Sequence, residues 1–174
     1  MKSKEIFAFL VLFLFVSSLC IFAQGQEPVD PVNWRELVPF LIDISGWESE
    51  GEAEGSTVSM ANFKVSEVER SYTAEDKELN IKIVDGGYVQ MMYAGVKMAM
   101  NFEIDTSEEY VKKITIKGFS GIERYDYEDK EAEVIILIEE RFLVQLEGNN
   151  FKDASSLTAI AETLDLKGIA NLAK

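Results

Sequence analysis

The sequence has no histidine and only one cysteine, Cys20, among its 174 residues. Cys20 lies in an apolar run near the N-terminus, so the rest of the chain has neither imidazole nor thiol. This part therefore lacks a histidine general base, a thiolate nucleophile and the usual nitrogen and sulfur ligands of zinc. A single cysteine also excludes a disulfide within the chain, so the core alone must stabilise the fold.

The first 25 residues have the three parts of a secretory signal peptide. Lys2 and Lys4 precede an almost unbroken apolar run over 6–22, and a small-x-small sequence follows at 23–25. This order is typical of a segment that a signal peptidase removes. We therefore expect cleavage after Gly25 and a secreted or periplasmic protein. A retained anchor is the alternative, although membrane spans usually need about 20 apolar residues.

Cys20 offers a second alternative, because lipoprotein signals end at a cysteine that receives lipid. Leu19 precedes it, where such signals have a small residue, so this pattern disfavours a lipoprotein. The expected organisation is a signal peptide at 1–25 and a single domain at 26–174, since about 150 residues make one ordinary domain. No stable membrane span is expected after cleavage.

Basic residues are scarce, with 17 lysines and arginines against 31 aspartates and glutamates. Cleavage would remove Lys2, Lys4 and Glu5 and leave a net charge of −15. Such a surface repels nucleic acid and anionic lipid, and it suits a basic or cationic partner. Solubility alone also explains it, because no block of like charge is long enough to form a tail.

The pattern after residue 30 predicts a short N-terminal helix. Four apolar residues recur there at helical spacing: Trp34, Leu37, Val38 and Leu41. Asp30 before Pro31 is expected to cap this helix, and Pro39 to bend or shorten it. The acidic, glycine-containing stretch at 48–56 is expected to be a solvated loop.

Seven segments have the alternation or the β-branched and apolar content of strands: 57–63, 65–73, 79–83, 110–118, 122–127, 134–138 and 141–148. The third is expected to end in a turn at 85–87. Segment 134–138 (VIILI) is continuously apolar, as a central strand covered on both faces is. Short connections predict an α+β domain whose mainly antiparallel sheet of about six to seven strands is flanked by helices.

Three further helices complete the expected order. The segment 88–102 has apolar residues near helical spacing and is expected to cover the sheet. Asp153 is expected to cap the next helix, whose apolar stripe is Leu157, Ile160, Ala161 and Leu164. Asp165 is expected to cap a last short helical turn.

Serine catalysis is disfavoured by the sequence. The stretch Gly118-Phe119-Ser120-Gly121 superficially resembles a nucleophile elbow but lacks the second glycine at the required spacing. No histidine is present to activate the serine, and residues 26–174 contain no Ser-x-x-Lys. We interpret this stretch as a turn between two strands.

Carboxylates leave two chemical alternatives open. A glycoside hydrolase needs one protonated and one ionised carboxyl group, and three pairs are candidates: Glu67 with Glu69, Asp126 with Glu128, and Glu139 with Glu140. The run 126–129 has three carboxylates that could contact calcium, although the EF-hand pattern is missing. Many acidic residues make such groupings common, so a solvated loop is the simpler interpretation.

Four methionines lie within ten residues of the expected central helix: Met91, Met92, Met98 and Met100. Methionine fills irregular cores and also forms adaptable binding surfaces. We expect these residues mainly to pack the core, with Met91 and Met98 as the candidates for a partner surface. Thioether ligation of Cu(I) is a further alternative.

Seven short stretches are similar to a group of uncharacterised exported bacterial proteins: Trp34-Arg35-Glu36-Leu37, Phe40-Leu41, Gly46-Trp47, Arg70-Ser71-Tyr72, Ile83-Val84-Asp85, Arg141-Phe142-Leu143-Val144 and Asp165-Leu166-Lys167. The layout also resembles the Mog1/PsbP-like fold, an antiparallel sheet between helices. Members of that fold are mostly binding or assembly factors, so the resemblance implies a non-catalytic role by analogy. It assigns no functional residues.

Together these features predict an exported, soluble, non-catalytic protein that binds another envelope or extracellular protein, with a basic surface as the suggested partner. No cofactor, catalytic residue or metal ligand is assigned. The alternatives are a hydrolase that uses acidic residues and a calcium or Cu(I) binding protein.

Overall fold

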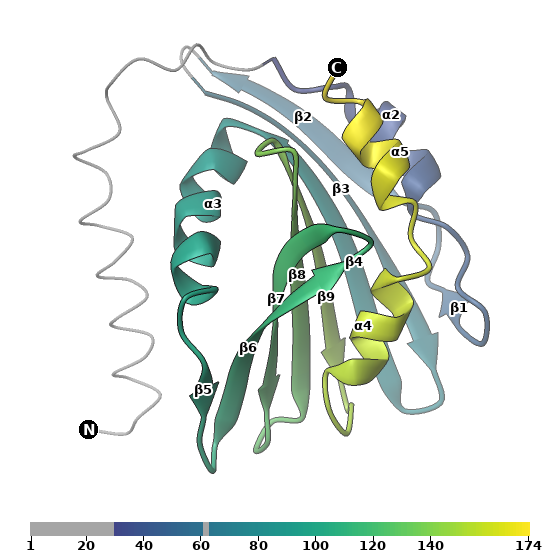
Figure 1. Ribbon diagram of the computed structural model, residues 1–174. Helices are drawn as coiled ribbons and strands as arrows, with labels where there is room; N and C mark the ends of the chain where they lie inside the picture. The colour runs from purple at the N-terminus through teal and green to yellow at the C-terminus, as the bar shows by residue number, and fades with distance from the viewer. Residues whose placement is uncertain (1–29, 61–62) are drawn as a thin grey trace.

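The computed structural model describes residues 30–60 and 63–174 of the chain. The expected signal peptide and Cys20 lie outside the described residues. Within them, nine strands form one sheet in which every paired neighbour is antiparallel. Helices lie on both sides of this curved sheet (Figure 1). The α+β class expected from the sequence is therefore confirmed.

The strands are β1 Glu48–Ser49, β2 Glu54–Met60, β3 Phe63–Ala74, β4 Lys77–Gly86, β5 Ile104–Asp105, β6 Glu109–Ile116, β7 Phe119–Asp126, β8 Glu131–Ile138 and β9 Phe142–Asn149. The helices are α2 Trp34–Leu37, the 3-10 turn η1 Val38–Phe40, α3 Gly87–Ala99, α4 Ser155–Ala161 and α5 Leu166–Asn171. The strand order is β1-β3-β4-β9-β8-β7-β6-β5, and β2 also pairs with β3.

The expected strand count was too low by the two shortest strands, β1 and β5. β1 lies within the expected loop at 48–56, and β2 also begins inside that stretch, at Glu54. β1 forms because β3 extends beyond the part that β2 covers, so its last residues pair with Glu48 and Ser49 instead. β5 pairs through two residues with the start of β6. Such short pairings depend on a neighbouring strand rather than on local composition.

The first described helix is capped by Asn33, and the prediction of Asp30 was wrong. The Asn33 side chain accepts a hydrogen bond from the backbone N–H of Arg35, at 3.0 Å, and Glu36 completes a capping box. Asp30 instead forms an ion pair with Lys64 on β3. Pro39 lies in η1, directly after the four-residue α2, so the predicted shortening is confirmed.

The predicted turn at 85–87 was also wrong, because Asp85 and Gly86 are the last residues of β4 and Gly87 begins α3. Gly86 has a φ of 112°, and a Cβ there would lie 2.4 Å from the carbonyl oxygen of Lys64. Only glycine allows this close backbone approach between β3 and β4. The chain therefore passes from strand to helix without a separate turn.

The two C-terminal helices follow the predicted stripe with one difference at the caps. Asp165 accepts a hydrogen bond from the N–H of Gly168 at 2.9 Å and caps α5 as predicted. The N-cap position of α4 is Ala154, which makes no side-chain capping bond. Asp153, one residue earlier, accepts a hydrogen bond from the N–H of Ser155 at 2.8 Å.

Alternation along each strand divides the apolar side chains between two cores. The larger core lies between the sheet and α2, α4 and α5, and the smaller lies between the sheet and α3. In β8, Val134, Ile136 and Ile138 enter the first core, whereas Ile135 and Leu137 enter the second. The predicted central strand, covered on both faces, is therefore confirmed.

None of the helices in the described ranges is long and apolar enough to span a bilayer.

Candidate functional site

The sheet face that carries α3 is apolar only under that helix. Val84, Ile135 and Leu143 point to this face and belong to the smaller core. Because side chains alternate along a strand, every second residue from these positions points to the same face, and beyond the smaller core these residues are mostly polar. We call this set the acidic sheet face: Glu67, Glu69, Ser71, Thr73, Glu78, Asn80, Lys82, Glu109, Lys113, Arg124, Asp126, Glu131, Glu133, Gln145, Glu147 and Asn149. It contains eight carboxylates and three basic side chains.

Glu133 and Glu147 lie at the middle of this face. They are directly opposite each other in the β8–β9 register, and the Gln145 side-chain amide donates to both, at 2.8 Å and 2.7 Å. Burial raises the pKa of Glu133. The hydrogen bond from Gln145 lowers this pKa in part, and the nearby negative charge of Glu147 raises it again. One amide thus holds together two carboxylates with different surroundings.

Two of the basic side chains on the face are paired with carboxylates of the same face. Lys82 Nζ lies 2.9 Å from Glu69 Oε2, and Arg124 Nε lies 3.0 Å from Glu109 Oε2. Toward the β3–β4 end, a hollow of about 160 Å³ is lined by Glu50, Ser71, Tyr72, Glu78, Leu79, Asn80, Glu147 and Asn149. This volume is below the roughly 300–1,000 Å³ typical of small-molecule sites and suits a single side chain.

The opposite face contains a buried carboxylate with several partners, Glu123 on β7. Its carboxylate accepts from Lys112 Nζ at 2.8 Å and from Thr158 Oγ1 at 2.7 Å, and Tyr110 OH lies 3.4 Å away. The hydrogen bond from Lys112 to Glu123 raises the pKa of Lys112, and burial raises the pKa of Tyr110. Both shifts favour the protonated forms, which are poor nucleophiles and bases. This cluster therefore attaches α4 to the sheet.

The second buried ion pair joins β4 to the β8–β9 turn. Arg141 donates from Nε and Nη2 to the two oxygens of Asp85, at 2.8 Å and 2.9 Å, and Val32 N–H donates to the same carboxylate at 2.7 Å. Arg141 Nη2 also donates to the carbonyl oxygen of Asp30. These contacts fix the first described residues against the sheet.

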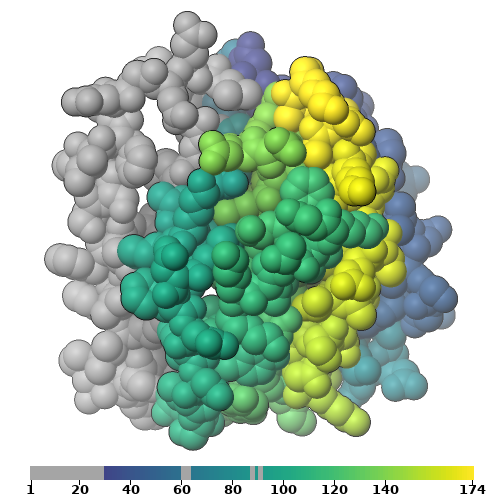
Figure 2. All heavy atoms as spheres, viewed as in Figure 1, coloured from purple at the N-terminus to yellow at the C-terminus, as the bar shows by residue number. Residues whose placement is uncertain are grey.

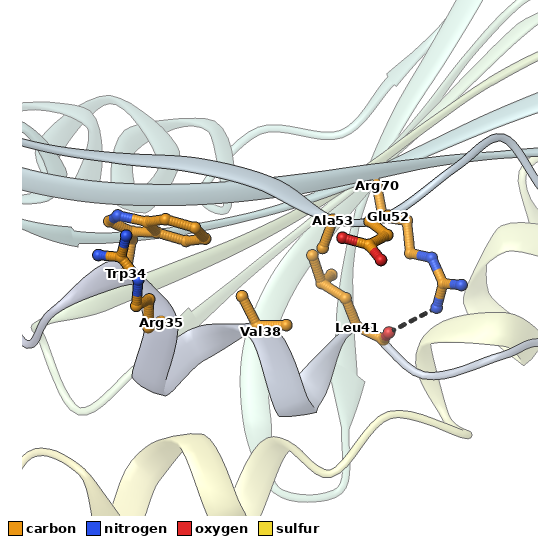
Figure 3. Close-up of a pocket in the computed structure, with 7 residues that line it drawn as sticks. All are labelled: Trp34, Arg35, Val38, Leu41, Glu52, Ala53 and Arg70. Atoms are coloured by element: carbon orange, nitrogen blue, oxygen red, sulfur yellow. Dashed lines mark hydrogen bonds between the residues drawn. The ribbon is translucent and has the colours of Figure 1, made fainter.

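A groove of about 430 Å³ lies between α2, η1 and the β1–β2 connection (Figure 3). It is lined by Trp34, Arg35, Val38, Leu41, Glu52, Ala53 and Arg70. The Arg35 guanidinium lies 4.4 Å from the centre of the Trp34 ring, at one end. Near the other end, Arg70 donates to the Leu41 carbonyl oxygen at 3.0 Å and pairs with Asp43 at 2.9 Å. Both guanidinium groups are therefore already engaged within the chain.

The carboxylate pairs suggested by the sequence lie outside the groove and the hollow described above. None of their six members lines the groove or the hollow. Glu69 is paired with Lys82, and Glu140 with Lys97. The sequence did not reveal Glu133 with Glu147, because these residues lie on different strands and become neighbours only through strand register.

The candidate calcium and serine residues belong to turns and strands. Asp126 accepts hydrogen bonds from the N–H groups of Glu128 and Asp129, at 2.9 Å and 3.0 Å, and so stabilises the β7–β8 turn. The described ranges contain no group of three or more acidic or cysteine side chains placed to hold a metal ion. Lys117 and Gly118 form the tight β6–β7 turn, and Ser120 lies on β7.

Three of the four clustered methionines have described side chains. Met92 and Met100 are half-buried against the core under α3, which confirms the packing interpretation for both. Met98 is 43% exposed, so it differs from Met100 in its surroundings. The side chain of Met91, the other candidate for a partner surface, lies outside those that the structure describes.

Comparison of this chain with protein-family models, with curated proteins and with solved structures gave no match. The resemblance to the Mog1/PsbP-like fold therefore remains a prediction.

Proposed function

We propose that this is an exported, non-catalytic protein that binds a basic component of the cell envelope through the acidic sheet face. The observation that carries the proposal is the excess of eight carboxylates over three basic side chains on one sheet face. A field of one sign attracts partners of the other sign. The hollow beside Glu147 is of a size to receive one basic side chain of the partner.

Two further points support a binding role. The polar groups buried on the opposite face are bonded to one another, and the pKa values of Lys112 and Tyr110 are raised, away from those of a working nucleophile or base. The proposed Mog1/PsbP-like character agrees by analogy, because members of that fold are mostly binding or assembly factors.

The test is a pull-down from native envelope with immobilised residues 26–174, followed by affinity measurements with the captured protein. Changing Glu131 and Glu147 to glutamine should weaken binding about tenfold or more and reduce its salt dependence, because two charges facing the partner are lost. The matched control changes Glu75 and Glu162, which are exposed elsewhere, to glutamine. Equal losses in both double variants would contradict a role for this face.

The hydrolase alternative is supported by one observation, the pairing of Glu133 with Glu147. The raised pKa of Glu133 would suit a general acid, and its neighbour could act as the base or nucleophile. A screen of the protein against glycans and esters tests it. Turnover that is lost in Glu133→Gln and kept in Glu131→Gln would favour the enzyme over the binding protein.

A further inference from the structure

The outward side of α3 is apolar at its C-terminal end. Among the described residues, the large hydrophobic side chains that are exposed are Ile42, Val58, Met98, Phe102 and Tyr127. Two of these are Met98, in the last turn of α3, which is 43% exposed, and Phe102, three residues after the end of the helix, which is 60% exposed. Ala94 and Gly95, one turn before Met98, are also exposed. We call Ala94, Gly95, Met98 and Phe102 the α3 ridge. Described atoms of α3 are among the teal spheres in Figure 2.

Gly95 is a residue that the fold itself does not require. A Cβ at this position would have no heavy atom within 4 Å, and its φ is not in the left-handed region. Glycine inside a helix lowers the stability of the helix relative to alanine. A position without a side chain, between exposed hydrophobic residues, instead allows the backbone of another chain to approach closely.

The charges around the ridge indicate the kind of partner. Lys97 is the single charged residue of α3, and it is paired with Glu140 at 2.9 Å. Glu103 and Asp105 lie one and three residues after Phe102, and both are exposed. The ridge is therefore an apolar strip with an acidic border. A second copy would bring two acidic borders together, which like-charge repulsion disfavours.

We propose that the α3 ridge is the docking site for an amphipathic, basic helix of the partner. Its apolar stripe would pack on Met98 and Phe102 and cross closely over Gly95, while lysine or arginine side chains would face Glu103 and Asp105. This is the helix-on-surface mode of recognition, in which apolar residues at i, i+3, i+4 and i+7 anchor the ligand. The inference rests on the proposed function and names the part of the partner that binds.

The probe for this site is a synthetic leucine–lysine peptide with leucines at i, i+3, i+4 and i+7. Its controls are a scrambled peptide of the same composition and a leucine–glutamate peptide. Fluorescence anisotropy with residues 26–174 should show binding of the amphipathic basic peptide, with both controls at least about tenfold weaker, a difference of about 1.4 kcal/mol. Failure of the basic peptide to bind, or equal binding of the scrambled one, would overturn the proposal.

Variants then locate the peptide on the protein. Replacing Met98 and Phe102 with serine should weaken binding about tenfold or more, as expected for central apolar anchors. The matched control replaces Ile42 and Val58, which are exposed outside the ridge, with serine and should change affinity less than about threefold. The same loss in both double variants would overturn the ridge assignment.

Gly95→Gln separates docking from folding. The open space at this position accommodates the side chain, and glutamine favours helix, so thermal stability should be kept or raised. Peptide affinity should nevertheless fall about fivefold or more, because the side chain holds the partner helix away. Unchanged affinity would contradict close approach at Gly95 and overturn the ridge geometry.

Two outcomes distinguish this inference from the proposed function. Loss of peptide binding in Glu131→Gln/Glu147→Gln, with full binding in the ridge variants, would leave the acidic sheet face as the site and remove the ridge. Concentration-dependent dimerisation that is lost in Phe102→Ser, measured by sedimentation, would assign the ridge to self-association and overturn a basic partner there.

Discussion

The two faces of the sheet differ in how their polar groups are bonded. On the face covered by α2, α4 and α5, the buried carboxylates of Asp85 and Glu123 are each bonded to partners from distant segments. On the other face, α3 covers the apolar end, and the acidic sheet face has more carboxylates than basic groups to pair with them. Polar residues of the first face hold the fold together, whereas those of the second form the surface that we propose for a basic partner.

The largest expected effect is on the covered face, at the Asp85–Arg141 pair. Arg141→Met would leave the fully buried Asp85 carboxylate without its bidentate partner and should reduce the free energy of unfolding by about 3–5 kcal/mol. The control, Lys82→Met, breaks a half-exposed pair on the acidic sheet face and should cost less than about 1 kcal/mol. Urea denaturation measures both, and equal costs would remove the contrast between the faces.

The two cores should also differ in their sensitivity to truncation. Ile136→Ala removes a fully buried side chain from the larger core and should cost about 2–5 kcal/mol. Met92→Ala removes a half-buried side chain from the smaller core, so its cost should fall near or below the low end of that range. A larger loss for Met92→Ala would show that the smaller core dominates stability.

The central position of β8 predicts slow hydrogen exchange. The amide hydrogens of Ile135 and Leu137 should exchange only on global unfolding.

Replacing glycine with alanine should have opposite effects on stability at Gly148 and at Gly95. A Cβ at Gly148, on the covered face, would lie 2.4 Å from the Phe151 ring, so Gly148→Ala should destabilise by about 1–3 kcal/mol. Gly95→Ala meets no atom and should stabilise by about 0.5–1 kcal/mol. Thermal melting of both variants measures the difference. Destabilisation by Gly95→Ala would mean that the fold itself needs glycine at this position.

The smallest expected effect is the pH dependence of Glu133. Its pKa is raised in the folded protein above the usual value of 4.5, mainly by burial. The unfolded chain therefore releases this proton first as pH rises, and stability falls between the usual pKa and the folded one. Glu133→Gln should consequently be stabilised relative to the parent at pH 7, with the gain shrinking below pH 4.5. Urea titrations at pH 7 and pH 4 check this, with Glu131→Gln as the control.

Strands and central helix were predictable because their signals are local. The continuous apolarity of 134–138 identified β8, and the apolar spacing in 88–102 identified α3. Errors arose where a distant residue decides the conformation. Asp85 lies in β4 and binds Arg141, 56 residues away, instead of forming the expected turn. Asp30 binds Lys64, 34 residues away, instead of capping the first helix.

The candidate site was less predictable for the same physical reason. Carboxylates two residues apart are visible in the sequence, but Glu133 and Glu147 meet only across the β8–β9 register. Exposure of Met98 and burial of Met92 depend on which side of α3 meets the sheet. The composition did predict an acidic surface, but not that one face of the sheet would concentrate it.

The contacts of the first described residues determine when these residues can be fixed during synthesis of the chain. Asp30 and Val32 are held by Arg141 and by Asp85, which come 111 and 53 residues later in the chain. A ribosome synthesises the N-terminal end first, so the bond to Asp85 can form once β4 has been made, but the bond to Arg141 cannot form until the β8–β9 turn has been made. The contact between the start of the domain and Arg141 therefore forms only after 111 further residues have been synthesised, late in the synthesis of the chain.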